Sequence, residues 1–203
     1  MGKLVSIVGS SGSGKTTLAR VICQTEGFTP FLEDLNIRPF QAGFMRELKA
    51  NALPNQVDFL LFRAEQEIAI RNHDLIGIQD GGLDLDYHVF SRLFLENKYL
   101  SEPEFALVGR FYTLLRSFLP PTDCMIKLNI PLAVLAERRN TRLRSLDITI
   151  NSDLVKIDGL IKDWFGQNSP SSPVLEVDYQ KDDVSFAQSI GKILEFIRQH
   201  TSG

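Results

Sequence analysis

The stretch Gly9-Ser10-Ser11-Gly12-Ser13-Gly14-Lys15-Thr16 decides the fold of this sequence. It meets the pattern G-x-x-x-x-G-K-S/T at every fixed position, and it lies between an apolar run at residues 4–8 and a helical pattern at residues 16–24. Glycines let the backbone point successive N–H groups at phosphate oxygens, and a helix N-terminus adds a partial positive charge. Because strand, loop and helix occur in the required order, the stretch predicts a phosphate-binding loop rather than a chance glycine-rich turn.

The residues of this loop have distinct chemical roles in the prediction. Lys15 is expected to reach the β- and γ-phosphates of a nucleoside triphosphate, and the Thr16 hydroxyl is expected to bind Mg²⁺. The residues expected to hold ATP, or another nucleoside triphosphate, are Gly9, Ser10, Ser11, Gly12, Ser13, Gly14, Lys15, Thr16 and Thr17. The loop alone does not identify the phosphate acceptor, since GTPases, motor ATPases and small-molecule kinases share it.

The rest of the chain alternates between strand and helix patterns. Further apolar runs typical of strands occupy residues 29–33, 75–80, 124–129 and 174–177. Helices are predicted at residues 55–72, 85–97, 104–119, 131–144, 153–165 and 184–200, and the stretch with Pro39 and Pro54 is expected to be irregular. Strands that alternate with long crossovers form a parallel sheet. We therefore predict a single α/β domain over residues 1–203, with about five parallel strands and helices on both faces.

The composition narrows the class of partner. The 203 residues carry 22 basic and 25 acidic side chains, so a net charge of −3 gives the chain no general attraction to nucleic acid or an anionic membrane. The apolar run at residues 4–8 is too short to cross a bilayer, and no signal-peptide cleavage pattern follows it. We expect a cytoplasmic protein with a small-molecule partner. Cys23 and Cys124 have no close Cys or His, which predicts two buried thiols rather than a zinc site or a disulfide.

Acidic residues at two predicted strand ends, and a group of arginines, suit phosphoryl transfer. Glu33 and Asp34 end the second strand and Asp80 ends the third, at the carboxyl edge of the sheet where open α/β folds bind ligands. One acid can serve as a base and another can lie near a metal ion. Four arginines suit a lid over the transferred group, and they are Arg138, Arg139, Arg142 and Arg144. The alternative for these arginines is a solvated basic helix end.

Several segments occur in the order and spacing of one kinase family. They are Phe31-Leu32-Glu33, Arg38-Pro39-Phe40, and residues 52–63, 79–90 and 135–147. Together they resemble the deoxynucleoside kinase family, notably its bacterial members that act on purine deoxynucleosides, over nearly the whole chain. The resemblance implies a P-loop kinase fold with an arginine-rich lid. It also implies phosphate transfer from ATP, with Mg²⁺, to the 5′-hydroxyl of a deoxynucleoside, a purine being favoured.

The resemblance further implies roles for individual residues. Glu33 is implied as the base for the 5′-hydroxyl, Asp80 as a neighbour of the metal beside Thr16, and Lys15, Arg138 and Arg142 as catalytic cations. Arg144 joins Arg138 and Arg142 in the lid on the phosphate donor. The residues implied to bind the acceptor are Glu33, Gln56, Arg63, Asp86, Phe90 and Asp147. Of these, Gln56 and Asp86 read the base, Arg63 supports Asp86, Phe90 stacks on the base, and Asp147 contacts the sugar. Taken singly, each residue has another explanation: a helix surface for Gln56, a core position for Phe90 and an ion pair for Arg63. Only their occurrence together, in the order of the family, favours binding of the acceptor.

Two departures from the family pattern affect the expected activity. After Asp80 the family has an arginine near the acceptor hydroxyl, and this chain has Gly81, which carries no charge. Where the family has a tyrosine that contacts the sugar, this chain has Met45, which cannot donate that hydrogen bond. Arg38 or Arg46 is our hypothesis for a substitute cation.

Two other functions stay open on the same scaffold. One is a kinase for another small alcohol or a nucleoside monophosphate, and the other is a nucleotide-binding protein that has lost catalysis. The apolar content of the helices around residues 59–70 and 105–119 also allows a homodimer, which the family often forms.

Overall fold

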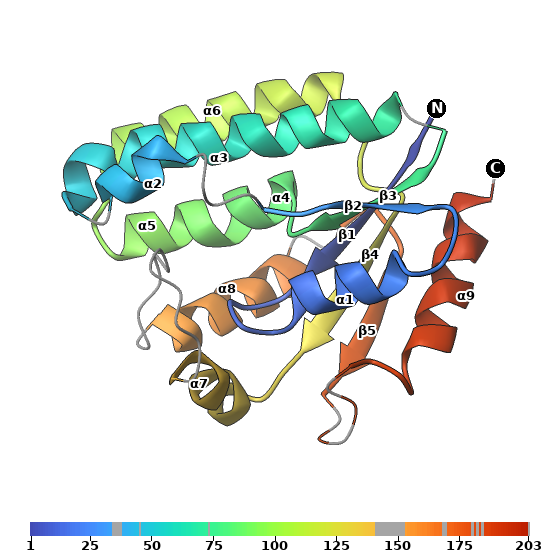
Figure 1. The fold of residues 1–203 in the computed structure, drawn as a ribbon. Helices are drawn as coiled ribbons and strands as arrows, with labels where there is room; N and C mark the ends of the chain where they lie inside the picture. Colours follow the sequence, from blue (N-terminus) through green and yellow to red (C-terminus); the bar gives the residue numbers. More distant parts are fainter. Residues whose placement is uncertain are drawn as a thin grey trace.

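The computed structural model describes residues 1–33, 38–44, 46–72, 74–140, 153–167, 170–179, 181, 183 and 185–202. Strands and helices alternate along the chain (Figure 1). The elements are β1 (Lys3–Val8), α1 (Lys15–Ile22), β2 (Phe28–Phe31), α2 (Pro39–Phe44), α3 (Leu48–Arg71), β3 (Ile76–Asp80), α4 (Leu83–Leu85), the π-helical segment η2 (Asp86–Ser91), α5 (Arg92–Glu96), α6 (Glu102–Phe118), β4 (Cys124–Asn129), α7 (Leu132–Asn140), α8 (Asp153–Gln167), β5 (Val174–Asp178) and α9 (Ile190–Thr201).

The five strands form one parallel sheet in the order β2-β3-β1-β4-β5. β1 lies in the middle, where Val5 pairs with Ile78 of β3 and with Cys124 of β4. The predicted α/β class and the parallel sheet of about five strands are confirmed. Because all strands run in one direction, the loop after β1 and the ends of β2 and β3 share the carboxyl edge of the sheet.

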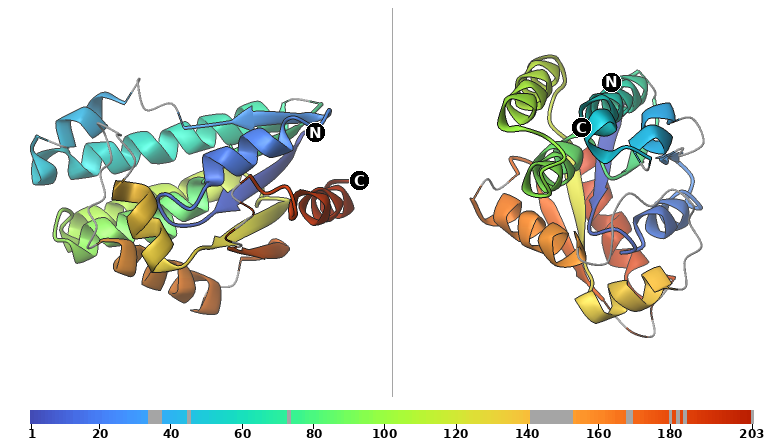
Figure 2. Two further views of the ribbon diagram at one scale, coloured as in Figure 1. Left: turned by 60° about the horizontal axis from the view of Figure 1, so that its bottom comes forward. Right: turned by 90° about the vertical axis from the view of Figure 1, so that its left-hand side faces the viewer.

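Alternate residues of the strands face different helices, so both faces of the sheet are covered (Figure 2). Val5 and Ile7 of β1 pack in a cluster with buried residues of α1 and α9. Val8 packs on the other face with residues of η2, α5 and α8. A third cluster joins α2, α3, α5 and α6, and α3 and α6 run side by side (Figures 1 and 2).

The structure corrects the prediction of an irregular stretch around Pro39 and Pro54. Pro39 is the first residue of α2, where the missing N–H costs nothing, and Pro54 lies inside α3, which begins at Leu48 and not at residue 55. Ala52 and Phe44 are fully buried in one cluster. This packing of the first turns of α3 against α2 outweighs the hydrogen bond that Pro54 cannot donate.

The last helix begins at Ile190, six residues later than predicted. Phe186 has a positive φ of 59°, which interrupts a right-handed helix. The Asp183 carboxylate accepts hydrogen bonds from the backbone N–H groups of Gln188 and Ser189, at 2.9 and 3.1 Å. These contacts favour a turn before α9, so residues 185–189 do not form a helix although their pattern predicts one.

The helix predicted at residues 85–97 is divided in the structure. It starts at Leu83, passes through η2, and continues as α5 to Glu96. A π-helical turn widens the helix by one residue and is frequent at functional sites. Asp86 and Phe90, both predicted to bind the acceptor, lie in this segment.

Among the described residues, no helix has the length and apolar character needed to cross a bilayer. Cys124 is buried and Cys23 is half-buried, and both are free thiols.

Candidate functional site

The loop between β1 and α1 has the backbone that phosphate binding requires. Gly12 and Gly14 have positive φ values of 82° and 100°, in the left-handed region that glycine adopts without strain. Gly14 is also the N-cap of α1, so the free N–H groups of the helix point into the loop. A Cβ on Gly9 would lie 3.2 Å from the Leu128 Cβ, which shows how closely the loop packs against β4.

Lys15 is held by the loop itself. Its Nζ donates to the carbonyl oxygens of Gly9 and Ser10, at 3.0 and 3.1 Å. Burial lowers the pKa of the Lys15 ammonium, and the carboxylates of Asp80 and Glu33 oppose that shift. Phosphate oxygens bound at the loop would also raise the pKa of Lys15, as these carboxylates do. An anionic ligand therefore favours the charged form of Lys15.

Thr16 and Asp80 meet at the start of α1 and the end of β3. The Thr16 hydroxyl donates a hydrogen bond to a carboxylate oxygen of Asp80. A hydroxyl oxygen and a carboxylate oxygen are hard ligands of the kind that Mg²⁺ prefers, and Mg²⁺ at nucleotide sites takes few protein ligands beside phosphates and water. The donor set therefore fits Mg²⁺.

Arg138 of α7 lies against the same loop, as the lid prediction requires. Its Nη1 donates to the carbonyl oxygens of Ser13 and Gly12, at 3.3 and 3.4 Å. Its guanidinium also lies 5.3 Å from the centroid of the Tyr179 ring. This places one of the arginines predicted for the lid beside the phosphate-binding loop. Arg139 also lies in α7, whereas residues 141–147 of the predicted lid, with Arg142, Arg144 and Asp147, lie outside the described residues.

Glu33, Arg63 and Asp86 form a charged group at the same edge of the sheet. Glu33 lies two residues beyond the end of β2 at Phe31, so it is not part of the strand as predicted. Arg63 of α3 donates from Nε to Asp86 Oδ2 at 2.8 Å and from Nη2 to Glu33 Oε2 at 3.4 Å. The structure thus brings together three residues that the family resemblance assigns to the acceptor.

Burial shapes the electrostatics of this group. Desolvation raises the pKa of Glu33 and of Asp86, and the Arg63 guanidinium opposes the rise at both carboxyls. Desolvation disfavours the charge of Arg63, but Asp86 and Glu33 outweigh it and raise the pKa of Arg63. Glu33 alone of the three keeps a substantial part of its side chain accessible, 30% against 3% for Arg63 and 7% for Asp86. Glu33 is therefore the carboxylate that can meet a ligand.

Two glutamines that carried no role in the sequence prediction hold this group in place. Gln66 accepts from Arg63 Nη1 at 3.2 Å and donates to the Leu32 carbonyl oxygen at 3.0 Å. Gln79 of β3 donates to Gln66 Oε1 at 3.1 Å. The signal for Gln66 was its spacing of three residues from Arg63, which puts both side chains on one face of α3.

Gln56 and Ser91 form a second polar contact at the acceptor side. Both are buried, and the Ser91 hydroxyl donates to Gln56 Oε1 at 2.8 Å and lies 3.0 Å from the Asp86 carbonyl oxygen. Phe90 is only partly buried and packs against the cluster of η2, α5 and α8. Met45, which replaces the family tyrosine, lies outside the described residues.

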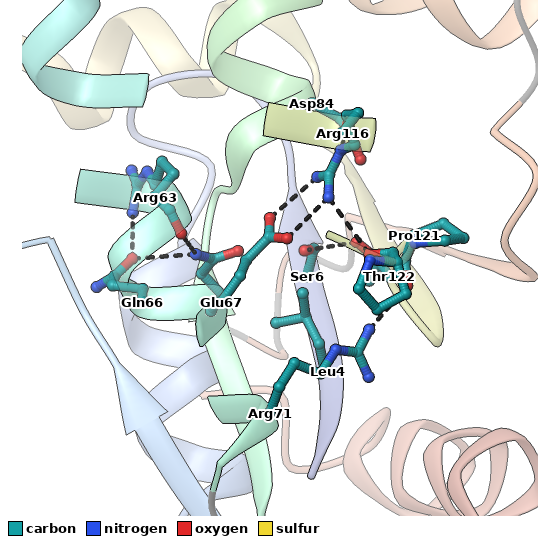
Figure 3. Close-up of polar contacts among 12 residues, drawn as sticks. Leu4, Ser6, Arg63, Gln66, Glu67, Arg71, Asp84, Arg116, Pro121 and Thr122 are labelled. Atoms are coloured by element: carbon teal, nitrogen blue, oxygen red, sulfur yellow. Dashed lines mark hydrogen bonds and ion pairs between the residues drawn. The ribbon is translucent and has the colours of Figure 1, made fainter. Parts of the chain in front are cut away.

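A second ion-pair network is built around the buried carboxylate of Glu67 on α3 (Figure 3). Arg116 of α6 donates to both oxygens of Glu67 on α3, at 2.7 and 2.9 Å, and to Asp84 at 2.7 Å. Tyr112 also donates to Asp84, at 2.8 Å. Asp84 stands two residues before Asp86, so this network helps to hold the backbone next to Asp86.

Comparison with known proteins agrees with this geometry. The family model described as "Deoxynucleoside kinase" matches residues 5–202. The chain is 26% identical over 185 residues to the deoxyguanosine kinase of Bacillus subtilis (strain 168), covering 88% of this chain and 87% of that protein. It is 21% identical over 206 residues to a deoxyadenosine/deoxycytidine kinase of the same strain, covering 97% of this chain and 94% of that protein.

Solved structures show the same fold. The deoxyadenosine kinase from M. mycoides with the products dCMP and dCDP bound superposes with a TM-score of 0.83 at 21% identity, covering 97% of this chain and 99% of that one. The structure of that kinase with bound dCTP gives a TM-score of 0.80 at 19% identity, with the same coverage. These likenesses establish the P-loop kinase fold over nearly the whole chain.

Proposed function

This chain belongs to the deoxynucleoside kinase family, and we propose that it transfers the γ-phosphoryl group of ATP to the 5′-hydroxyl of a deoxynucleoside, with a purine favoured. The observation that carries the proposal is the position of Glu33, a partly accessible carboxylate that shares the carboxyl edge of the sheet with Lys15 and Asp80. The relatives named deoxyguanosine kinase and deoxyadenosine/deoxycytidine kinase support a deoxynucleoside acceptor, and each name includes a purine deoxynucleoside.

In the proposed reaction Glu33 takes the proton of the 5′-hydroxyl while the hydroxyl oxygen bonds to the γ-phosphorus. The bond from that phosphorus to the β-phosphate oxygen breaks, and ADP leaves with the electron pair. Desolvation raises the pKa of Glu33, which makes its carboxylate a stronger base, and Arg63 keeps it ionised. Lys15 and the loop N–H groups bind the negative charge of the phosphates, and Arg138 is positioned at the same loop.

We assign Mg²⁺ to Thr16 and Asp80, whose oxygens meet beside the loop. When bound, Mg²⁺ supplies positive charge that offsets the charge on the β- and γ-phosphate oxygens. Arg142 and Arg144 are assigned to the lid together with Arg138, and Thr17 to the first turn of α1 at the phosphates.

The acceptor base is assigned to Gln56 and Asp86, with Phe90 as the stacking ring and Asp147 as the sugar contact. With its Oε1 bound to Ser91, Gln56 offers its Nε2 as a donor, and Asp86 keeps one oxygen free of Arg63. Adenine, guanine and cytosine each present a donor next to an acceptor on one edge, so this pair suits more than one base.

The test is ADP formation with ATP and Mg²⁺ against a panel of deoxynucleosides, ribonucleosides and nucleoside monophosphates. Glu33→Gln is compared with Glu65→Gln, which changes an exposed glutamate on α3. We expect deoxynucleoside-dependent turnover that Glu33→Gln abolishes and Glu65→Gln retains. Turnover only with another acceptor would replace the proposed substrate. ATP binding without turnover on any acceptor would show a protein that has lost catalysis.

We also propose a homodimer through α3 and α6. Large apolar side chains are exposed along these two neighbouring helices, and they are Leu61, Ile68, Leu107, Leu114 and Phe118. Phe118 is 78% exposed, which is costly for a ring that faces only water. Light scattering on wild-type protein and on a Leu114→Glu, Phe118→Glu variant tests this, with a dimer expected for the first and a monomer for the second.

A further inference from the structure

Gly81 leaves a space that another residue fills. Its φ of 91° is in the left-handed region, and a Cβ built on it would lie 3.0 Å from Arg63 Nη2. A side chain at position 81 would therefore require the Arg63 guanidinium to shift. The absence of a side chain at Gly81 is what allows Arg63 to approach the turn after Asp80.

Arg63 uses its whole guanidinium in this position. Nε binds Asp86, Nη1 binds Gln66, and Nη2 reaches Glu33. Arg63 is only 2% exposed, and a guanidinium keeps its charge even when buried. One rigid planar group thus connects Asp86, the carboxylate assigned to the nucleobase, with Glu33, the carboxylate assigned to proton abstraction.

Arg38, one of the two substitute cations hypothesised from the sequence, is engaged elsewhere. Arg38 forms an ion pair with Asp58 at 3.0 Å, and its guanidinium lies 3.9 Å from the centroid of the Phe62 ring. Both partners belong to α3, so Arg38 is bound to that helix. Arg63, by contrast, reaches the Glu33 carboxylate itself.

We propose that Arg63 is a positioning residue for catalysis, which holds the Glu33 carboxylate toward the acceptor hydroxyl in place of an arginine at position 81. The proposal rests on the proposed function and extends the role of Arg63 beyond support of Asp86. In this arrangement Arg63 couples recognition of the nucleobase at Asp86 to the placement of Glu33, the residue that takes the proton.

Four charged groups from different elements surround Glu33. They are Lys15 of α1, Arg63 of α3, Asp80 of β3 and Asp86 of η2. The two cations lower the pKa of Glu33 and the two carboxylates raise it. Removal of the Arg63 charge therefore raises the pKa of Glu33, and removal of the Asp86 charge lowers it. These shifts test whether Arg63 and Asp86 act on the Glu33 carboxylate, and the change in kcat tests whether the contact of Arg63 with Glu33 serves catalysis.

The experiment is a pH titration of the Glu33 carboxyl carbon by ¹³C NMR, assigned by its loss in Glu33→Gln, in wild type, Arg63→Gln and Asp86→Asn. The same variants are followed by the pH profile of kcat/KM. We expect Arg63→Gln to raise the pKa of Glu33 in the NMR titration by about one pH unit. The acid limb of the kcat/KM profile should move to higher pH by the same amount, and kcat should fall. Asp86→Asn should move both downward and act mainly on KM for the nucleoside. An unmoved Glu33 titration in Arg63→Gln would overturn the proposal.

A conservative variant and the NMR readout keep the test decisive. Arg63→Lys retains the charge but cannot bind Asp86 and Glu33 at once, so its kcat should fall by about tenfold or more while the Glu33 titration moves less than in Arg63→Gln. Wild-type kcat in Arg63→Lys would overturn the proposal even if Arg63→Gln did not fold. If wild-type protein showed no turnover, the proposed function would fail, whereas the NMR titration would still report on the contact of Arg63 with Glu33.

Discussion

The Ser91 hydroxyl donates a hydrogen bond of 2.8 Å to Gln56 Oε1, between η2 and the buried face of α3. This contact fixes which end of the amide faces away from Ser91. With Oε1 engaged, Gln56 presents its Nε2, which can only donate. Ser91 therefore sets the hydrogen-bonding character of one of the two residues assigned to the base.

Ser91→Ala should weaken binding of the preferred nucleoside. Loss of the hydroxyl frees the Gln56 amide to turn, at about 1 kcal/mol for one neutral hydrogen bond, so KM should rise roughly fivefold with a smaller change in kcat. Ser101→Ala is the matched control, because it removes the same group from the cap of α6, far from the base. The check is steady-state kinetics on several deoxynucleosides. Equal KM values for wild type and Ser91→Ala would contradict the assigned role.

The features that sequence predicted well are those that short segments encode. The phosphate-binding loop, the five strands and the place of Asp80 at the end of β3 each follow from a local pattern. The approach of Arg63 to Glu33 does not, because the two residues are 30 positions apart and meet only through the order of β2 and β3 and the packing of α3. From the sequence, Gly81 indicates only the loss of a charged side chain. The structure shows that a Cβ at this position would lie 3.0 Å from Arg63 Nη2, so the glycine leaves room for Arg63.

The predicted starts of two helices were wrong because contacts that the helical pattern does not show decide where each helix begins. Pro54 predicts a break, yet buried contacts of α2 with the first turns of α3 decide where that helix begins. Near α9, the polar cap by Asp183 and the positive φ of Phe186 outweigh a good helical pattern. Contacts between elements override local preference at the start of α3, and a local side-chain cap does so before α9.

Gly81→Ala should reduce catalysis more than its backbone strain explains. The new Cβ would lie 3.0 Å from Arg63 Nη2, so the guanidinium must shift, and its contact of 3.4 Å with Glu33 should be disturbed. Gly27→Ala is the matched control, because Gly27 has a similar φ of 95° and an added Cβ there meets nothing within 4 Å. Both variants should lose about 1–2 kcal/mol of stability from strain in the left-handed region. Only Gly81→Ala should lower kcat, measured well below the melting temperature of both.

Arg116→Met should destabilise the fold strongly. Glu67 has no exposed surface, and Arg116 binds both of its oxygens. Removal of one partner leaves a buried charge without compensation, which costs about 3–5 kcal/mol. Urea denaturation gives the free energy of unfolding. Arg110→Met is the control, because Arg110 is an exposed arginine on the same helix and should change stability by less than about 0.5 kcal/mol. A combined Glu67→Leu, Arg116→Met variant should recover much of the loss, since no unpaired charge remains at Glu67.

Both thiols should resist modification in the folded protein. Burial raises the pKa of Cys23 to about 11 and that of Cys124 to about 12, so at pH 8 only about one thiol in a thousand or fewer is the reactive thiolate. Ellman's reagent should therefore label native protein slowly and label guanidinium-unfolded protein at ordinary rates. Because Cys124 lies in β4 within the main core, its labelling requires opening of the fold. Arg116→Met, which brings the unfolded state closer in free energy, should speed the labelling of Cys124 by about two orders of magnitude or more, and Arg110→Met should not. Fast labelling of Cys124 in the wild-type protein would contradict its burial in the core.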